Sequence, residues 1–145
     1  MITQFIISMI ATISFAILYD APKKHLFYCG LTGGVGWVIY YMMAKLHYNM
    51  IFYAFASAFA LTLISRILAI VREAPVTMFL IPGIFPIVPG AGIYYTSYYF
   101  FINDLHRSIF QGEGTVKIAL SIAFGIIMAM AIPQFLFAYL KLLKR

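Results

Sequence analysis

Charged residues are scarce in this sequence. Only 10% of its 145 residues are Asp, Glu, Lys or Arg, while 64% are hydrophobic. A soluble domain usually carries about a quarter charged residues, because charged side chains cover its water-facing surface. The shortage therefore excludes a soluble globular protein. It indicates an all-α integral membrane protein, since helices satisfy their backbone hydrogen bonds internally in lipid.

Cysteines and catalytic motifs are also missing. The single cysteine, Cys29, lies in an apolar run, which excludes an internal disulfide and a metal site built from cysteines. There is no HExxH, Ser-His-Asp set, CxxC, phosphate-binding loop or pair of carboxylates. The sequence therefore predicts that the protein is not an enzyme and that it has no cofactor and no metal.

The sequence has no basic stripe, although its formal net charge is +6. The ten Lys and Arg residues are spread over short connections and the C-terminus, without interleaved exposed aromatics. This pattern argues against a nucleic-acid partner. Contact with anionic membrane lipid and the setting of topology explain the positive charge better.

What the chain has in quantity is long apolar stretches. A bilayer core of about 30 Å needs about 20 apolar residues per helix. The sequence predicts a single transmembrane domain over residues 1–145. About five spans are expected, at residues 2–19, 26–44, 51–71, 76–101 and 115–140. We interpret the first as a retained helix rather than a cleaved signal peptide, because it lacks a basic start and a small-residue cleavage site.

The fourth span is the least regular. Its apolar residues 78–101 contain three interruptions: Pro82-Gly83, Pro86 and Pro89-Gly90. Proline removes a backbone donor and glycine loosens the helix, so the freed groups need partners in other helices or in a wet cavity. Broken helices of this kind hold substrates in many transporters. The alternatives are a kinked helix that only packs, or a loop, and the segment either crosses the membrane or dips in and returns.

The second span carries four glycines within seven residues: Gly30, Gly33, Gly34 and Gly36. Small residues at this spacing let the backbone of another helix approach closely. We therefore expect these glycines to be helix-packing positions.

A cation lies inside the third span. Arg66 is about 9 Å along the helix axis from Arg72, at 1.5 Å per residue. Its side chain either reaches the headgroups or, as a buried cation, meets an anionic substrate or a carboxylate, and the residues alone favour neither reading. Glu73 is the only acid between Asp20 and Asp104. It is therefore the candidate partner of Arg66 or Arg72 in an ion pair or gate.

Tyrosines follow the interrupted stretch. Tyr94, Tyr95, Tyr98 and Tyr99 form two i,i+4 pairs on adjacent helix faces. An aromatic belt at the membrane surface is the favoured interpretation, and a pathway lined by hydroxyl groups is the alternative. The polar stretch 102–114 that comes next is expected to be an exposed connection.

The basic residues determine the predicted orientation. With five spans, seven Lys and Arg residues share one side against three on the other, whereas four spans give at best 6:4. The larger group is Lys23, Lys24, Arg66, Arg72, Lys141, Lys144 and Arg145. The positive-inside rule then places the N-terminus outside and the C-terminus in the cytoplasm.

Several short motifs follow one another along the chain in a familiar order. They are Asp20-Ala-Pro22-Lys-Lys, Gly30-Leu-Thr-Gly33-Gly34-Val-Gly36-Trp37, Ser65-Arg66, Arg72-Glu-Ala-Pro75, Ile84-Phe-Pro86-Ile-Val-Pro89-Gly90 followed by Tyr94, and Ala119-Leu-Ser-Ile-Ala123-Phe-Gly125. By these motifs the chain resembles, over nearly its whole length, the small C-terminal-half subunit of the threonine/serine exporter (ThrE-type) family. Ile87 stands where leucine is common in that family.

The resemblance implies a subunit of a secondary exporter that moves small polar solutes, threonine and serine first, out of the cell. It also implies a larger ThrE-type membrane subunit as partner in a hetero-oligomer of the bacterial cytoplasmic membrane. Related split pairs export dicarboxylates, which is one alternative, and a structural subunit without a pathway is the other. The hypothesis places Arg66, Pro86, Pro89, Gly90 and Tyr94 along the substrate pathway, with the coupling acid in the partner.

Overall fold

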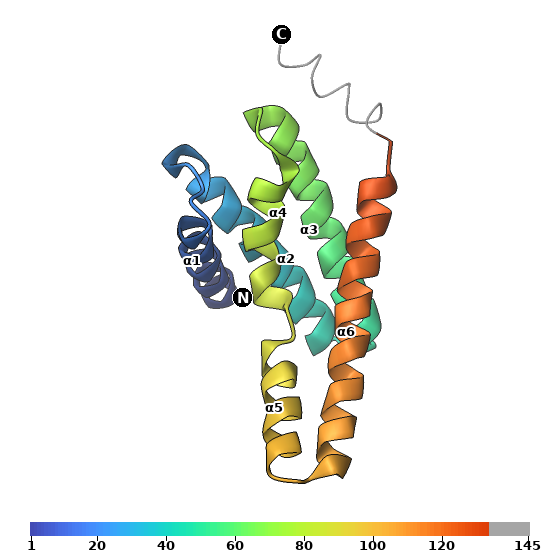
Figure 1. The fold of residues 1–145 in the computed structure, drawn as a ribbon. Coiled ribbons are helices and arrows are strands. Elements are labelled where there is room, and N and C mark those ends of the chain that lie inside the picture. Colours follow the sequence, from blue (N-terminus) through green and yellow to red (C-terminus); the bar gives the residue numbers. More distant parts are fainter. Residues whose placement is uncertain (134–145) are drawn as a thin grey trace.

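The computed structural model describes residues 1–133, and every regular element in this part of the chain is helical (Figure 1). The elements are α1 (Ile2–Leu18), the 3₁₀ turn η1 (Lys23–His25), α2 (Leu26–Lys45), α3 (Met50–Arg72), α4 (Val76–Ile84), the 3₁₀ turn η2 (Phe85–Ile87), α5 (Gly90–Phe101) and α6 (Leu105–Ala131). The expected all-α fold is confirmed. The end of the expected last span and the basic residues Lys141, Lys144 and Arg145 lie outside the described residues.

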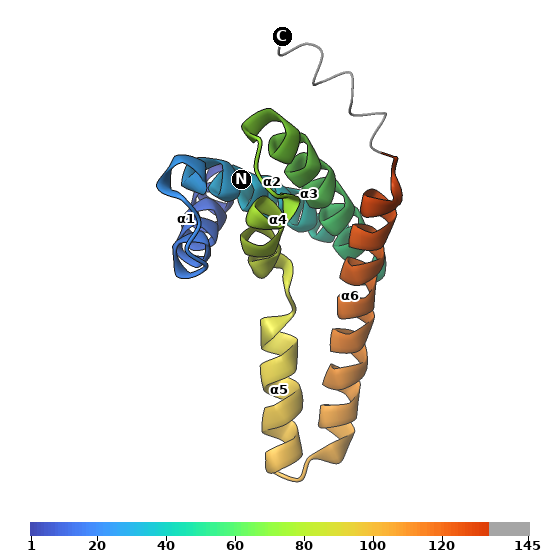
Figure 2. The same cartoon turned by 45° about the horizontal axis from the view of Figure 1, so that its top comes forward.

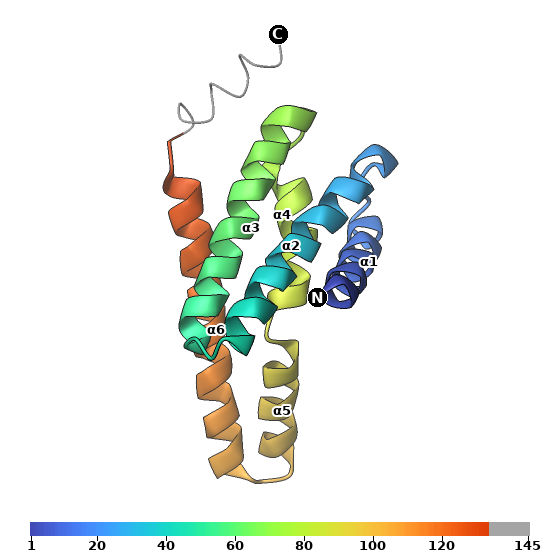
Figure 3. The ribbon, with the colours of Figure 1, turned by 180° about the vertical axis from the view of Figure 1, so that it is seen from behind.

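The helices form a bundle from which one hairpin projects. α2, α3 and α4 pack against one another, α1 lies on α2, and α6 lies along α3. α5 packs on the beginning of α6, and the two extend together beyond the turn that joins α2 to α3 (Figures 1 and 2). The view from behind shows the same projection (Figure 3). We call residues 90–117 the α5–α6 hairpin.

Glycines let α1 approach α2 closely. A Cβ added to Gly33 would lie 2.0 Å from Thr12 Oγ1, and the nearest atoms to Gly30 and Gly34 are also side chains of α1, each at 2.7 Å. Ser8 of α1 donates a hydrogen bond to the Gly33 carbonyl at 3.1 Å. These contacts place the glycine-rich face inside the chain's own bundle, where close van der Waals contact and interhelical hydrogen bonds hold membrane helices together.

α3 is approached closely from two sides. A Cβ on Gly36 of α2 would lie 2.6 Å from Leu61 Cδ1, and Ser57 donates to the Gly36 carbonyl at 2.6 Å. On the other side, a Cβ on Gly125 of α6 would lie 2.7 Å from the backbone oxygen of Phe55. Glycines of α2 and α6 therefore let both helices pack closely on α3.

Three helical units are long and apolar enough to cross a membrane: η1 with α2, α3, and α6. The stretch from α4 to α5 adds a fourth if the bent pair is one span. α1 has only 17 residues, which at 1.5 Å per residue is about 26 Å, short of a core of about 30 Å. The expected count of five spans is thus not confirmed.

The expected connection over residues 102–114 is wrong, because α6 begins at Leu105, although most of these residues are exposed as expected. Only a short turn separates α5 from α6, with Asn103 in the left-handed region at φ 60°. The Asp104 side chain accepts a hydrogen bond from the Arg107 N–H at 3.2 Å, which begins α6 ten residues earlier than expected. Gly112 lies within α6 and faces Thr96 of α5, whose Cγ2 would lie 3.3 Å from an added Cβ.

The expected break at Pro82-Gly83 is also wrong, because α4 runs through both residues. Pro82 has no N–H to donate to the carbonyl of Met78, four residues earlier. The buried thiol of Cys29 on α2 donates to that carbonyl instead, at 3.3 Å. A donor from a neighbouring helix therefore lets the helix continue past its proline.

Candidate functional site

The helix is interrupted at the second and third prolines of the segment. After η2, Val88 takes an extended conformation (ψ 133°) and Pro89 has ψ 58°, so the helical hydrogen-bond ladder stops. The Gly90 N–H bonds back to the Val88 carbonyl at 2.8 Å, and α5 then begins. The helices on the two sides of the break differ in direction by 53°, and Figure 1 shows α5 leading away from α4.

The beginning of α5 presents backbone N–H groups. The first helical bond there runs from the Ile93 N–H to the Pro89 carbonyl at 3.1 Å, and Pro89 supplies no side-chain cap. The earlier N–H groups of a helix have no partner within it, and they carry the positive end of the helix dipole. This helix end, formed by Pro89, Ala91 and Gly92, lies along the wall of a cavity.

The cavity, which we call the break pocket, has a volume of about 460 Å³. It lies where the bundle ends and the α5–α6 hairpin begins, next to the first turn of α3. Its polar lining comes from α2 and α6: Tyr40, Gln111, Glu113, Thr115 and Lys117. The pocket therefore combines a helix end, one carboxylate, one ammonium group and several hydrogen-bonding groups.

Glu113 and Lys117 form an ion pair in the break pocket. Lys117 Nζ donates a hydrogen bond to Glu113 Oε1, one helical turn apart on α6. The side chains are 60% and 50% exposed, respectively, so both charges are accessible to a solute in the pocket. Thr115 donates its hydroxyl to the backbone carbonyl of Gln111 at 2.7 Å, and both residues line the pocket.

Arg66 lies elsewhere. Its side chain is 6% exposed and donates from Nη1 to the carbonyl of Ala129 on α6. That carbonyl lacks its normal partner because Pro133, four residues later, has no N–H. Along α3, Arg66 is about 12 Å from Ala58, which packs in the same cluster as Ile87 beside the break. Arg66 therefore caps the end of α6, and it does not line the break pocket.

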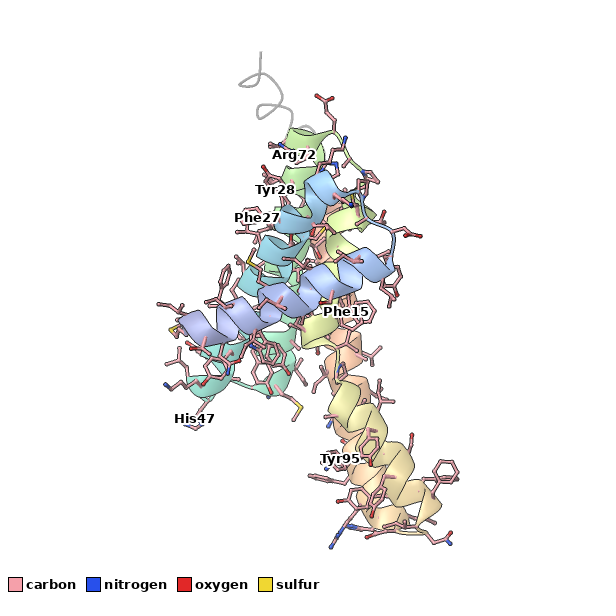
Figure 4. All side chains as sticks on the ribbon, turned by 90° about the vertical axis from the view of Figure 1, so that its left-hand side faces the viewer. Phe15, Phe27, Tyr28, His47, Arg72 and Tyr95 are labelled. Atoms are coloured by element: carbon pink, nitrogen blue, oxygen red, sulfur yellow. The ribbon has the colours of Figure 1, made fainter. Side chains whose placement is uncertain are left out.

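The expected gate residues are at the same end of the bundle as Arg66. Arg72 places its guanidinium over the ring of Tyr28, 4.5 Å from the ring centre. Glu73 is exposed and ends α3 in the left-handed conformation, with φ 50°. Figure 4 shows Arg72 beside Tyr28 at one end of the bundle, well away from Tyr95 on the hairpin.

The comparison with protein families gives a clear result. The model of the family described as "Threonine/Serine exporter, ThrE" matches residues 4–132, most of the chain. The chain belongs to the threonine/serine exporter family. It is therefore an integral membrane component of a transport system, and its family is a family of transporters, not of enzymes. No curated protein and no solved structure matches the chain.

In this exporter-family chain, the tyrosines of α5 face outward. Tyr94 is 62% exposed and stacks with Tyr98 at 6.2 Å, while Tyr95 stacks with Tyr99 at 6.2 Å. None of the four lines the break pocket. Of the other expected pathway residues, Pro89 lines the pocket, whereas Pro86 lies in η2 and Gly90 lies at the first turn of α5 outside the lining.

Sequence reasoning missed the charged pair of this exporter subunit. Glu113 lies inside the stretch 102–114, whose polarity predicts an exposed connection. A usable signal exists, since a Glu four residues before a Lys is the favoured orientation of an ion pair on a helix. No group of three potential metal-ligating side chains lies together within residues 1–133.

Proposed function

We propose that this chain is one subunit of a heteromeric secondary exporter and that the break pocket is part of its solute pathway. Threonine and serine are the first-choice substrates, with dicarboxylates as the alternative. The observation that carries the proposal is the pocket itself: the first residues after a helix break, together with an ion pair, line a cavity large enough for a small solute. In transporters, such half-helix ends bind anionic groups of the substrate.

The course of α4 and α5 supports one broken span. α5 continues away from the start of α4 in all three ribbon views and does not return toward it (Figures 1, 2 and 3). The break then lies near the middle of this span, and the pocket residues 111–118 lie near the middle of α6. We infer that residues 76–101 cross the membrane once.

We infer that the end of the bundle that carries Lys23, Lys24 and Arg72 faces the cytoplasm of a bacterial cell. These basic residues lie at the end of α1 and the end of α3, and basic residues are concentrated on the cytoplasmic side of membrane proteins. We propose that the N-terminus then lies on the outer side. The C-terminus lies on the cytoplasmic side.

The exposed surface of the α5–α6 hairpin supports a larger membrane subunit as partner. α5 has no buried residue, and Phe101, Ile109 and Phe110 are 80%, 70% and 71% exposed. A pair of helices with this much exposed apolar and aromatic surface is typical of a protein–protein or lipid contact. We propose that the partner packs on the hairpin and closes the break pocket.

Efflux from cells that lack their own exporters tests the proposal. Cells express the chain alone, or with the larger subunit encoded beside it, and are loaded with labelled threonine, serine or succinate. Efflux that requires both chains is the expected result. Efflux from this chain alone would replace the heteromeric arrangement with a homo-oligomer. No efflux of any of the three from a correctly inserted complex would reject the exporter assignment.

A blocking variant tests the pathway. Gly114 lines the break pocket, and a Cβ added there meets nothing within 4 Å, so Gly114→Phe puts a ring into the pocket without a clash at its first atom. Ala119→Phe is the matched control, because Ala119 is an exposed residue of the same helix outside the pocket. Loss of efflux in the first variant only, at equal complex yield, supports the pathway. Equal efflux from both variants would favour a structural subunit.

A further inference from the structure

The charges in the break pocket are balanced and differ in sign. Of the four acids of the chain, Asp20, Glu73 and Asp104 lie at helix ends or turns outside this pocket, and Glu113 alone lines it. Lys117 is the one cation that residues 1–133 contribute to the lining. They are one turn apart on α6, and the solute-accessible faces of both side chains are open. The pocket thus offers one negative and one positive site a few ångströms apart.

We propose that Glu113 and Lys117 select a zwitterionic α-amino acid. This inference rests on the proposed function of the pocket. The ammonium group of Lys117 binds the carboxylate of the substrate, and the carboxylate of Glu113 binds its ammonium group. The two charges of an α-amino acid lie on neighbouring atoms of one small group, so both fit between side chains that already reach one another. Charge-assisted hydrogen bonds of this type are stronger than neutral ones.

The net charge of the pocket stays zero when a zwitterion takes the place of the direct ion pair. Without solute, Glu113 and Lys117 neutralise each other, and with a bound zwitterion each charge still has an opposite partner. Unpaired charges are costly where water is excluded, so a neutral complex is the favourable one at a closed membrane site. The N–H groups at the beginning of α5 add positive potential for the carboxylate. Tyr40 and Gln111 provide hydrogen-bonding groups for a side-chain hydroxyl.

A dicarboxylate fits the same pocket poorly. One carboxylate of such a solute can bind Lys117, but the other then lies near the carboxylate of Glu113. Like charges at this distance repel, and the repulsion grows as water leaves the pocket. The pair therefore accepts amino acids and discriminates against dicarboxylates, and Glu113 is the residue that discriminates.

Competition between labelled threonine and labelled succinate tests this assignment in the complete complex. We expect Glu113→Gln to lower the ratio of threonine to succinate efflux by roughly tenfold, the effect of one lost charge-assisted hydrogen bond. Lys117→Gln is expected to lower efflux of both solutes, because both depend on the ammonium group. The exchanged pair Glu113→Lys with Lys117→Glu is expected to recover part of the threonine efflux, since it again offers both charges.

The second ion pair of the hairpin is the control. Asp104 and Arg107 lie 3.3 Å apart at the beginning of the same helix, outside the break pocket. Asp104→Asn and Arg107→Gln should leave the ratio unchanged at equal complex yield. If Glu113→Gln behaves like these controls, the inference is wrong while the exporter function stands. The same holds if the native complex moves succinate in preference to threonine, whereas a complex that moves neither solute rejects the exporter assignment itself.

Discussion

Replacing Gly125 with alanine tests how tightly α6 is packed on α3. An added Cβ would lie 2.7 Å from the backbone oxygen of Phe55, 3.1 Å from the backbone nitrogen of Phe59 and 3.2 Å from the Cβ of Ala58. Two of these three atoms belong to the backbone, which cannot rotate away as a side chain can. The methyl group therefore fits only if one helix moves by several tenths of an ångström.

The size of the effect follows from two opposing terms. Alanine is favoured over glycine inside a helix by about 1 kcal/mol. Overpacking a tight contact costs about 1–3 kcal/mol, and an immovable backbone atom puts this site at the upper end. We expect Gly125→Ala to lower the free energy of unfolding by about 2 kcal/mol after both terms are counted.

Gly114→Ala is the matched control on the same helix. Nothing lies within 4 Å of a Cβ at Gly114, so the substitution keeps the helix-propensity gain of about 1 kcal/mol without an overpacking cost. The order of stability should be Gly114→Ala, then the native chain, then Gly125→Ala. A titration with SDS, followed by circular dichroism of the purified protein, gives the midpoints. An unfolding midpoint for Gly125→Ala at or above that of the native chain would refute the close approach of α3 and α6.

Three further predictions concern helix ends and prolines. Cys29→Ala should destabilise the protein by about 1–3 kcal/mol because the Met78 carbonyl loses its donor, and Cys29→Ser should retain most of the stability, measured by the same titration. Arg66→Leu should lower the free energy of unfolding by about 1–3 kcal/mol, because the Ala129 carbonyl loses its donor. The loss should be smaller in a Pro133→Ala background, where residue 133 has an N–H that can bond this carbonyl. Equal losses in both backgrounds would reject the capping role. His47→Gly should raise the free energy of unfolding by about 0.5–1 kcal/mol, because His47 follows the end of α2 with φ 60°; an unchanged or lower unfolding midpoint would argue against strain there.

The membrane character of the chain and its family could be predicted from the sequence because both depend on local patterns. Scarce charge and long apolar stretches are properties of composition, and the family motifs are short runs of neighbouring residues. The interruption at Pro89 could be predicted for the same reason, since proline and glycine act on the backbone beside them.

Features that depend on distant residues could not be predicted. The path of α4 through Pro82 depends on the thiol of Cys29, 53 positions earlier, and no local rule connects the two. The first turns of α6 pack on α5, where Gly112 faces Thr96, 16 positions earlier. Arg66, an expected pathway residue, could not be placed from the sequence for the same reason, because its contact with Ala129 joins residues 63 positions apart. The residues alone favoured neither headgroup contact nor a buried cation that meets an anion; Arg66 is buried, and it donates to a backbone carbonyl, a partner that neither interpretation included.

Cys29 and Arg66 donate to carbonyls that a proline leaves without a helical partner, and both donors are synthesised before the proline concerned. Cys29 is synthesised before Pro82, and Arg66 before Pro133, so each donor belongs to a helix that leaves the ribosome first. Chains fold from the N-terminus while they are being made, at about 5–20 residues per second. α2 is therefore in place when α4 enters the bilayer, and α3 when α6 does. Each of these two helices, α4 with Pro82 inside it and α6 with Pro133 just after it, inserts against a neighbour that already holds its missing hydrogen-bond partner, so a permuted chain that makes α4 or α6 first should insert poorly.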